Sequence, residues 1–270
     1  MAEISKLRTM TGAGMMDCKN ALTETNGDIE KAIEIIRKKG QAVAAKRSDR
    51  EASEGCVLAA FDGEFAAIVA LKCETDFVAK NADFIALTQQ ILNLAVEKKQ
   101  ADLDALKALS IGDSTVEQLI TDRIGITGEK MELGAYEFVK GASTISYIHP
   151  GNKLATLAAF NLPNVELQVK KDIAMQIAAM SPISIDRSAV PAKVIAQELD
   201  IAKDKARQEG KPENMLDKIA EGRLNKFYQE STLLEQAFIK DAKISIAQYL
   251  KGQNNDLTVI DFKRVTLNQE

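Results

Sequence analysis

The sequence has 270 residues, which is enough for two or three domains with hydrophobic cores of their own. Hydrophobic residues make up 46% and charged residues 27%, as in an ordinary globular protein, and the formal net charge of −4 gives no general attraction for phosphate backbones. Trp is absent and aromatic residues are only 5%, which argues against a broad base-stacking surface, so no direct nucleic-acid binding is expected.

The beginning of the chain predicts a compact unit of three helices. A short amphipathic helix over residues 3–10 is broken by the small residues of Thr11–Gly14. A second helix over Met16–Thr25 ends at Asn26-Gly27, a pair that favours the left-handed conformation found at helix C-termini.

The third predicted helix begins after Asp28, a favourable N-cap residue. Its apolar residues recur at the helical spacing i, i+3, i+4 and i+7, at Ile29, Ala32, Ile33 and Ile36. We expect Gly40 to end this helix. Residues 41–54 have no strong apolar stripe, so residues 1–54 are predicted to form a helical domain and its linker.

The pattern changes from helix to strand at Gly55. Two apolar runs, Cys56–Phe61 and Glu64–Leu71, flank Asp62-Gly63, a strong signal for a β-hairpin. A helix over about Asn81–Lys99 follows. Ser114 and Glu117 then predict a capping box for a short helix that ends near Ile124, which completes a subdomain over residues 55–140.

A similar order of elements then returns over residues 141–270. Ala142–His149 and Lys153–Phe160 read as strands around the turn at Pro150-Gly151-Asn152, and Asn164 precedes a helix that reaches about Met180. The order of hairpin and then helix therefore occurs twice. This repeat of pattern predicts an α+β fold class with two related subdomains, each built on an antiparallel sheet.

An antiparallel helical hairpin over residues 187–232 is predicted as an insertion in the second subdomain. Two charged amphipathic helices over residues 189–230 flank Gly210-Lys211-Pro212. This pair is either a packed structural element or an external interaction surface, and homodimerisation through it is one candidate role. A helix near Ser245–Leu250 and an alternating strand over Leu257–Val265 should then return to the second sheet.

Few residues of the sequence suggest covalent chemistry. His149 is the one histidine, at a strand end, where a turn residue or a partner contact is the simpler interpretation. Gly12-Ala13-Gly14 lacks the third glycine of a dinucleotide-binding motif, and no phosphate-binding P-loop exists. The cysteines match no zinc spacing and are expected to be buried; they are Cys18, Cys56 and Cys73. We therefore expect no cofactor, no metal and no enzyme.

The sequence also predicts where the protein works. Met1–Ser5 contains no apolar signal core, and no later apolar run is long enough to span a bilayer, so we expect a cytoplasmic protein without membrane attachment. Because the sequence suggests no catalytic site, we expect the protein to act by binding a partner protein and changing its conformation.

An unusual loop lies between the first predicted hairpin and its helix, at Cys73–Asn81. Thr75 and Asp76 can cap or turn the backbone, and Phe77 and Val78 follow as apolar side chains in a polar segment. On pattern alone, Phe77 is expected to pack inward as a hydrophobic staple.

Two long segments stand out, which are Thr11–Leu22 (TGAGMMDCKNAL), followed by Asn26-Gly27-Asp28, and Thr75–Asn81 (TDFVAKN). Both closely resemble signatures of the bacterial elongation factor Ts family. Their order and spacing also agree with the family. A looser similarity covers nearly the whole chain, through Ile173-Ala174-Met175, Gly210-Lys211-Pro212 and Glu221-Gly222-Arg223.

The resemblance implies a function in translation elongation and a set of contact residues. Members of the family are guanine-nucleotide exchange factors that bind the GTPase elongation factor Tu and promote GDP release. They contain a ubiquitin-associated-like helical domain, a two-part α+β core and a helical hairpin. The implied partner-binding residues of this chain are Arg8, Met15, Met16, Thr75, Asp76, Phe77, Val78 and His149. On this basis Phe77 should insert between helices of the partner rather than pack inward.

Some positions depart from the family pattern, and other functions stay open. His149 is followed by Pro150-Gly151-Asn152 rather than directly by a small residue, and Arg123–Thr127 differs from the residues usual in the family at this segment. A C-terminal helix present in some members is not evident. The main alternative is a ribosome- or RNA-associated binding protein that uses the basic residues Lys46, Arg47 and Arg50. A module for ubiquitin-like proteins and an enzyme using His149 are lesser alternatives.

Overall fold

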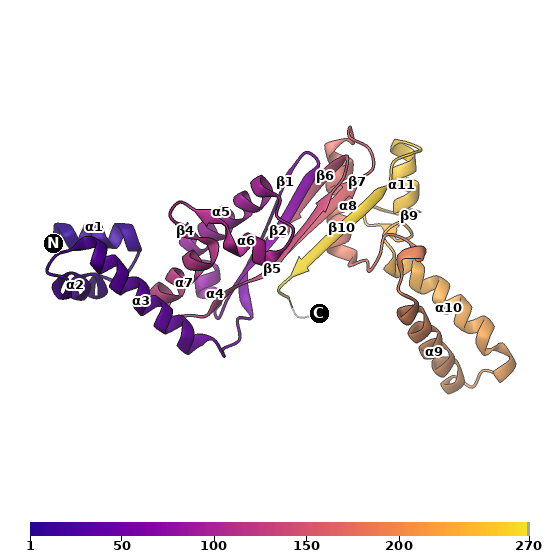
Figure 1. Cartoon of the computed structure of the whole chain (residues 1–270). Coiled ribbons are helices and arrows are strands. Elements are labelled where there is room, and N and C mark those ends of the chain that lie inside the picture. The colour runs from indigo at the N-terminus through magenta and orange to yellow at the C-terminus, as the bar shows by residue number, and fades with distance from the viewer. Residues whose placement is uncertain (269–270) are drawn as a thin grey trace.

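The computed structural model describes residues 1–268 and shows a mixed helical and sheet fold, with helical units projecting from opposite ends of a β core (Figure 1). The longer helices are α1 (Ala2–Thr11), α2 (Met15–Glu24), α3 (Ile29–Arg47), α5 (Ala82–Lys98), α7 (Val116–Thr127), α8 (Leu167–Met180), α9 (Ala192–Gln208) and α10 (Leu216–Ser231). The short helices are α4 (Asp76–Ala79), α6 (Leu103–Ala108), α11 (Ile246–Gln253), and the 3-10 turns η1 (Arg187–Ala189) and η2 (Glu213–Met215). The strands are β1 (Glu54–Asp62), β2 (Phe65–Cys73), β3 (Ser110–Ile111), β4 (Ser114–Thr115), β5 (Met131–Lys140), β6 (Ser143–Ile148), β7 (Leu154–Phe160), β8 (Ala237–Phe238), β9 (Asp241–Ser245) and β10 (Val259–Thr266).

The predicted three-helix unit is present at the N-terminus. Helices α1, α2 and α3 share a small core of buried side chains, which are Leu7, Ala13, Cys18, Ala21, Leu22 and Ala32. Gly12 ends α1 in the left-handed conformation with φ +68°, and the Asp28 side chain caps α3 by accepting a hydrogen bond from the backbone of Lys31.

The prediction that the third helix ends at Gly40 is wrong. Helix α3 continues through Gly40 to Arg47, so half of the expected linker is helical. Gly40 is buried against Gly125 of α7, where the absence of a side chain on Gly125 lets the two backbones approach. Here a tertiary contact outweighs the low helix propensity of glycine.

The first sheet has the strand order β1-β2-β5, with all pairs antiparallel. Gly63, at φ +59°, and Glu64 form the tight turn of the predicted β1–β2 hairpin. Strand β5 was not predicted, because a register shift opposite Ala70 and Leu71 disturbs its alternation of buried and exposed residues. Helix α5 packs on one face of this sheet and buries Phe84, Leu87 and Ile91.

The second sheet has the order β10-β7-β6, again antiparallel, and includes the predicted C-terminal strand. Helix α8 covers one of its faces through Val169, Ile173 and Ile177. The faces of the two sheets that no helix covers pack against each other. Their shared core is mostly small or β-branched and consists of Val57, Ala59, Ala66, Ile68, Ala70, Val139, Ala155, Leu157 and Ala159.

Two predicted helix starts are displaced in the structure. The capping box of α7 is formed by Thr115 and Gln118 rather than Ser114 and Glu117, since Thr115 accepts from the Gln118 N–H and the Gln118 side chain accepts from the Thr115 N–H. Helix α8 begins at Leu167, three residues after Asn164, and its N-cap residue Glu166 makes no capping hydrogen bond.

Helices α9 and α10 form the predicted hairpin, which projects away from the sheets (Figure 1). The two helices pack through a narrow seam of buried residues, namely Ala202, Ala206, Leu216 and Ala220. At the base of the hairpin the Arg187 guanidinium binds both Glu235 oxygens, donates to Asn225 at 2.8 Å and lies over the Tyr228 ring. This clamp joins the hairpin to the body of the protein.

Candidate partner-binding surface

Phe77 projects into solvent from α4, a single helical turn between the first hairpin and α5. Its side chain is 84% exposed, a large fraction for an aromatic residue. The expectation from pattern alone, that Phe77 packs inward, is therefore wrong. Its neighbours take the inward positions instead, because Val78 packs against the core of the first subdomain and Ala79 is buried.

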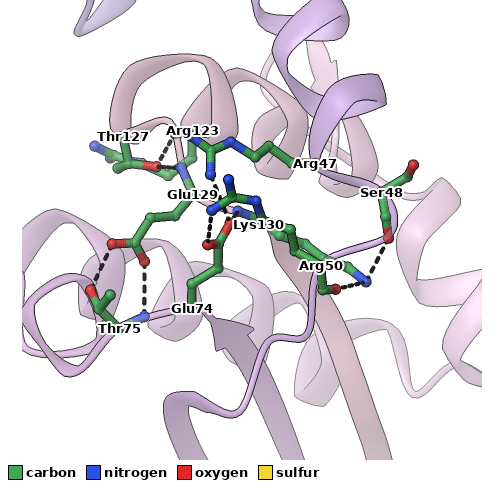
Figure 2. Close-up of polar contacts among 9 residues, drawn as sticks. All are labelled: Arg47, Ser48, Arg50, Glu74, Thr75, Arg123, Thr127, Glu129 and Lys130. Atoms are coloured by element: carbon green, nitrogen blue, oxygen red, sulfur yellow. Dashed lines mark hydrogen bonds and ion pairs between the residues drawn. The ribbon is translucent and has the colours of Figure 1, made fainter.

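Thr75 fixes the start of this turn through a clamp with Glu129 (Figure 2). The Glu129 carboxylate accepts from the Thr75 backbone N–H at 3.0 Å and from the Thr75 hydroxyl at 2.6 Å. The same hydroxyl oxygen caps α4 by accepting from the Val78 N–H. Glu129 lies between α7 and β5, so a distant segment of the chain holds the loop that carries Phe77.

Glu74, the residue before Thr75, forms a second anchor within the same cluster (Figure 2). Its carboxylate accepts from the Lys130 backbone N–H at 2.7 Å and from Arg50 at 3.0 Å, and Arg47 lies 3.7 Å away. The Lys130 N–H, followed by Arg50 and Arg47, lowers the pKa of Glu74. The Lys130 ammonium in turn donates to the carbonyls of Ser48 and Arg50.

Asp76 opens α4 and faces positive charge. Lys80, one helical turn further on, donates to the Asp76 carboxylate at 2.6 Å, and this hydrogen bond lowers the pKa of Asp76. Lys153 lowers it further through its charge, and Lys153 also forms an ion pair with Glu54 at 2.8 Å. Lys153 belongs to the turn between β6 and β7, so this positive charge acts on Asp76 from the second sheet.

His149 lies in that same turn and is exposed. Its backbone N–H donates to the Leu154 carbonyl, and its Nδ1 is 3.1 Å from the Tyr147 hydroxyl. Within residues 1–268 no carboxylate, serine, threonine or cysteine hydrogen-bonds to the imidazole, so the arrangement of a catalytic triad is not formed there. The geometry suits a surface contact.

The N-terminal unit presents a second apolar surface. Met15 and Met16 are 53% and 63% exposed at the start of α2. Arg8 and Met15 line one shallow hollow, and the described residues provide no hydrogen bond or ion pair to the Arg8 side chain. Met10, which the sequence interpretation did not single out, is equally exposed. Unbranched methionine side chains suit a contact surface that adapts to its partner.

The predicted residues therefore fall into two groups. One lies on α4 and on the turn that carries His149, which is bound to β1 through the Lys153–Glu54 ion pair, and the other lies on α1 and α2 beyond the α3 connection (Figure 1). The sequence interpretation missed the anchoring residues Glu74, Glu129 and Lys130. Glu74 stood next to the predicted segment, but no local pattern connects Thr75 with a glutamate 54 positions later.

Two negative findings concern the described part of the chain. No helix within residues 1–268 is both long and apolar enough to cross a membrane. In the same residues, no group of three or more His, Cys, Asp or Glu side chains is arranged to hold a metal ion.

The three cysteines are free and buried, as predicted, and burial raises the pKa of Cys56 to about 11 and of Cys73 to about 12.

Comparison with known proteins decides the family. The family described as Elongation factor TS matches residues 74–269, which begin at the anchor of the α4 loop. Elongation factor Ts of Porphyromonas gingivalis is 65% identical over 269 residues, covering 99% of this chain and 98% of the relative. The chain belongs to the elongation factor Ts family. It is thus an elongation factor of protein biosynthesis.

Other elongation factor Ts proteins are similar along their whole length. That of Azobacteroides pseudotrichonymphae is 54% identical over 268 residues, covering 99% of this chain and 98% of the relative. That of Phocaeicola vulgatus is 48% identical over 327 aligned positions, covering 100% of this chain and 99% of the relative. The longer alignment shows that this elongation factor Ts carries residues that the present chain lacks. The matches include the N-terminal unit, and so the segment that carries Arg8, Met15 and Met16.

Proposed function

We propose that the protein is a guanine-nucleotide exchange factor that binds the GDP form of elongation factor Tu in the cytoplasm and promotes GDP release. The observation that supports this most strongly is the exposed ring of Phe77 on a turn held by Thr75 and Glu129. An exposed aromatic side chain normally costs solubility, and a rigid support lowers the entropy lost when such a ring enters a partner pocket.

The proposed mechanism is mechanical. A GTPase holds GDP through backbone amides around the phosphates and through Mg²⁺, which demands near-ideal octahedral geometry at about 2.0–2.1 Å. Phe77, inserted between two partner helices, would shift these helices as packed units, because packed cores have discrete arrangements. A small displacement of the ligands then weakens the metal and the nucleotide together. Asp76 would hold polar groups nearby, while Arg8, Met15, Met16 and His149 supply affinity.

The exchange requires no covalent step. If the factor weakens GDP binding by a given ratio, GDP weakens binding of the factor by the same ratio. Entry of GTP therefore releases the factor, and an excess of GTP over GDP sets the direction of the cycle. This explains how a protein without a nucleotide-binding motif can act on a nucleotide.

The decisive experiment compares two exposed phenylalanines. Fluorescent GDP is loaded on elongation factor Tu, and its release is followed with Phe77→Ala and with the matched control Phe61→Ala, whose ring is 41% exposed at the far end of β1. Phe77→Ala should slow release about tenfold or more, as expected for an aromatic residue at the centre of an interface, whereas Phe61→Ala should act like the parent. If a folded Phe77→Ala protein releases GDP from elongation factor Tu as fast as the unsubstituted protein does, the proposed insertion of Phe77 between the partner helices is ruled out.

The alternative function, binding of RNA or the ribosome through Lys46, Arg47 and Arg50, finds less support. Arg47 and Arg50 are already paired with Glu74, which neutralises part of the positive charge there. A steep dependence of RNA affinity on salt would nevertheless favour it over nucleotide exchange.

A further inference from the structure

The N-terminal unit meets the core at a crossing of two helices that both carry a glycine. Gly40 is buried in α3, and Gly125 is half-buried in α7. A Cβ atom added to Gly125 would lie 2.6 Å from the Cα of Gly40, far inside van der Waals contact. The two backbones therefore touch, and neither flexible side chains nor solvent separates them.

This crossing is sterically asymmetric. A Cβ atom added to Gly40 would meet the Gly125 Cα and the Thr121 carbonyl at 3.6 Å, which is ordinary contact distance. A methyl group is therefore tolerated on α3 and excluded on α7. Because the atom that Gly125→Ala would strike belongs to the main chain, relief requires α3 to shift as a whole.

Contacts on either side of the crossing set the same alignment. The Ile126 side chain reaches the end of α1, where a Cβ on Gly12 would lie 3.1 Å from its Cδ1. The Arg37 guanidinium donates to the Ser114 hydroxyl at 3.2 Å. One contact joins α7 to the end of α1, and the other joins α3 to the residue before the α7 N-cap. Together they fix the angle between the N-terminal unit and the core as well as the distance between them.

The first half of the N-terminal unit is held less closely than the second half of α3, where Val43 and Ala44 pack on the core of the first sheet. Next to the crossing, an open groove of about 450 Å³ separates α1, α2 and the first half of α3 from α5 and α7. Met10 and Asp17 line it from the N-terminal unit, and Gln90 and Leu119 line it from the core. With this space unfilled, α1 and α2 take their orientation from α3, which is set by the glycine crossing and by the packing of Val43 and Ala44.

The same helix also reaches the support of Phe77. Arg47, the last residue of α3, and Arg50 just beyond it bind Glu74, which precedes the clamped Thr75 (Figure 2). One end of α3 thus packs with the helices that carry Arg8, Met15 and Met16, and the other end contacts the loop that carries Phe77. Two rigidly connected contacts share a single loss of rotational and translational freedom on binding.

We infer that the Gly40–Gly125 crossing is a positioning joint that sets the Arg8, Met15 and Met16 surface at a fixed place relative to Phe77. Gly125 is then a positioning residue that touches no partner itself. The inference rests on the proposed exchange function and extends it, because the N-terminal contacts contribute to binding only while the joint keeps them aligned.

A double-mutant cycle tests this joint. The affinity for GDP-bound elongation factor Tu is measured by calorimetry for the parent, Arg8→Ala, Gly125→Ala and the double variant. Arg8→Ala should weaken binding about tenfold in the parent, as expected for a charge-assisted contact, and less than about twofold when Gly125 is already alanine. Mere destabilisation by Gly125→Ala would leave the ratio for Arg8→Ala unchanged, so this ratio separates positioning from folding.

The chain offers matched glycine controls. Gly40→Ala places a methyl at the same crossing without a clash, and Gly222→Ala places one in a helix where no atom lies within 4 Å. Both should keep the full response to Arg8→Ala. If Gly125→Ala does not fold, Ile126→Ala enters the same cycle, since it loosens the contact with Gly12 without inserting an atom.

The outcomes are distinct. If Arg8→Ala still weakens binding about tenfold when Gly125 is alanine, the two losses multiply and the joint is overturned, because independent contacts add in free energy. If Arg8→Ala is silent in the parent, the Arg8 assignment fails and Met16→Ala takes its place in the cycle. If neither substitution weakens binding, the joint proposal is overturned, while the Phe77→Ala exchange assay still decides the proposed function on its own.

Discussion

Each of the two three-stranded sheets has a hairpin that is followed by a helix, but the two connecting loops place their apolar residues in opposite ways. In the first, the connection from β2 to α5 forms the helical turn that exposes Phe77. In the second, the connection from β7 to α8 folds Leu162 and Val165 against its own core. The difference lies in the supports, because Glu129, which binds Thr75, and Arg50 and Lys130, which bind Glu74, hold the first loop from outside its segment. A loop fastened by polar contacts no longer needs its aromatic side chain for stability, and that ring is free for binding.

The strongest way to break this comparison is to truncate the apolar residue of each loop. Phe77→Ala should leave the midpoint of thermal unfolding almost unchanged and slow GDP release about tenfold or more. Val165→Ala should do the reverse, lowering the free energy of unfolding by about 1–2 kcal/mol with normal exchange at a temperature where it is folded. Calorimetry and the fluorescent GDP assay give the two readouts. Equal effects of both variants on the rate of GDP release would contradict the proposal that Phe77 serves binding and Val165 serves stability.

The second test removes a support instead of the ring. Glu129→Ala leaves the Thr75 N–H and hydroxyl without their acceptor, so Phe77 should lose its fixed position and exchange should slow by about three- to tenfold, equivalent to about 0.7–1.4 kcal/mol. Glu132→Ala is the matched control, since this half-buried neighbour pairs with the Lys72 and Lys130 side chains and not with the loop. Exchange should be measured at saturating factor, and equal rates for the two variants would argue against the clamp.

Acid should weaken the anchor at Glu74. Its pKa in the folded protein lies below the ordinary value of 4.5, so its contribution to stability is complete above about pH 4.5 and is lost as the pH falls through the folded pKa. The stability difference between the parent and Glu74→Gln should therefore be about 1 kcal/mol near pH 7 and shrink below pH 4.5. Urea unfolding at a series of pH values measures it. A difference that stays constant down to pH 3 would show that the carboxylate charge is not involved.

The smallest effect is expected at the second subdomain. His149→Ala should weaken binding of elongation factor Tu by about 0.5–1 kcal/mol without altering the rate of GDP release at saturation, because an exposed turn residue contributes affinity only. Tyr147→Phe, which removes the hydrogen bond to the imidazole, should give part of this loss. Isothermal titration calorimetry distinguishes both from the parent, and a larger fall in the saturated rate would place His149 in the exchange step itself.

Regular elements of the fold could be predicted from local sequence. The β1–β2 hairpin followed from Asp62-Gly63 between two apolar runs, and the hairpin α9–α10 followed from two amphipathic segments around Gly210–Pro212. Interactions between distant segments could not. Gly40 has a low intrinsic helix propensity, yet α3 continues through it because Gly40 packs on Gly125 and Val43 and Ala44 pack on the core. The bulge opposite Ala70 and Leu71 disguised β5 in the same way.

The candidate site divides along the same line. Thr75, Asp76, Phe77 and Val78 could be singled out because their order resembles a family signature, but local pattern pointed the ring in the wrong direction. Its true direction depends on a glutamate that follows a different helix. Arg8, Met15 and Met16 are exposed as a contact surface requires, and their contribution to binding stays a prediction.

Because Cys18, Cys56 and Cys73 are buried, the reactivity of their thiols can be used to follow local unfolding of the protein. All three sulfurs are closed off from solvent, and only a minute fraction of Cys56 and Cys73 is thiolate at neutral pH. A thiol-alkylating reagent should therefore leave the native chain unmodified and react with each cysteine only when its surroundings open. Since Cys18 lies in the three-helix unit and Cys56 and Cys73 in the first sheet, mass spectrometry of the alkylated peptides would time the opening of each separately.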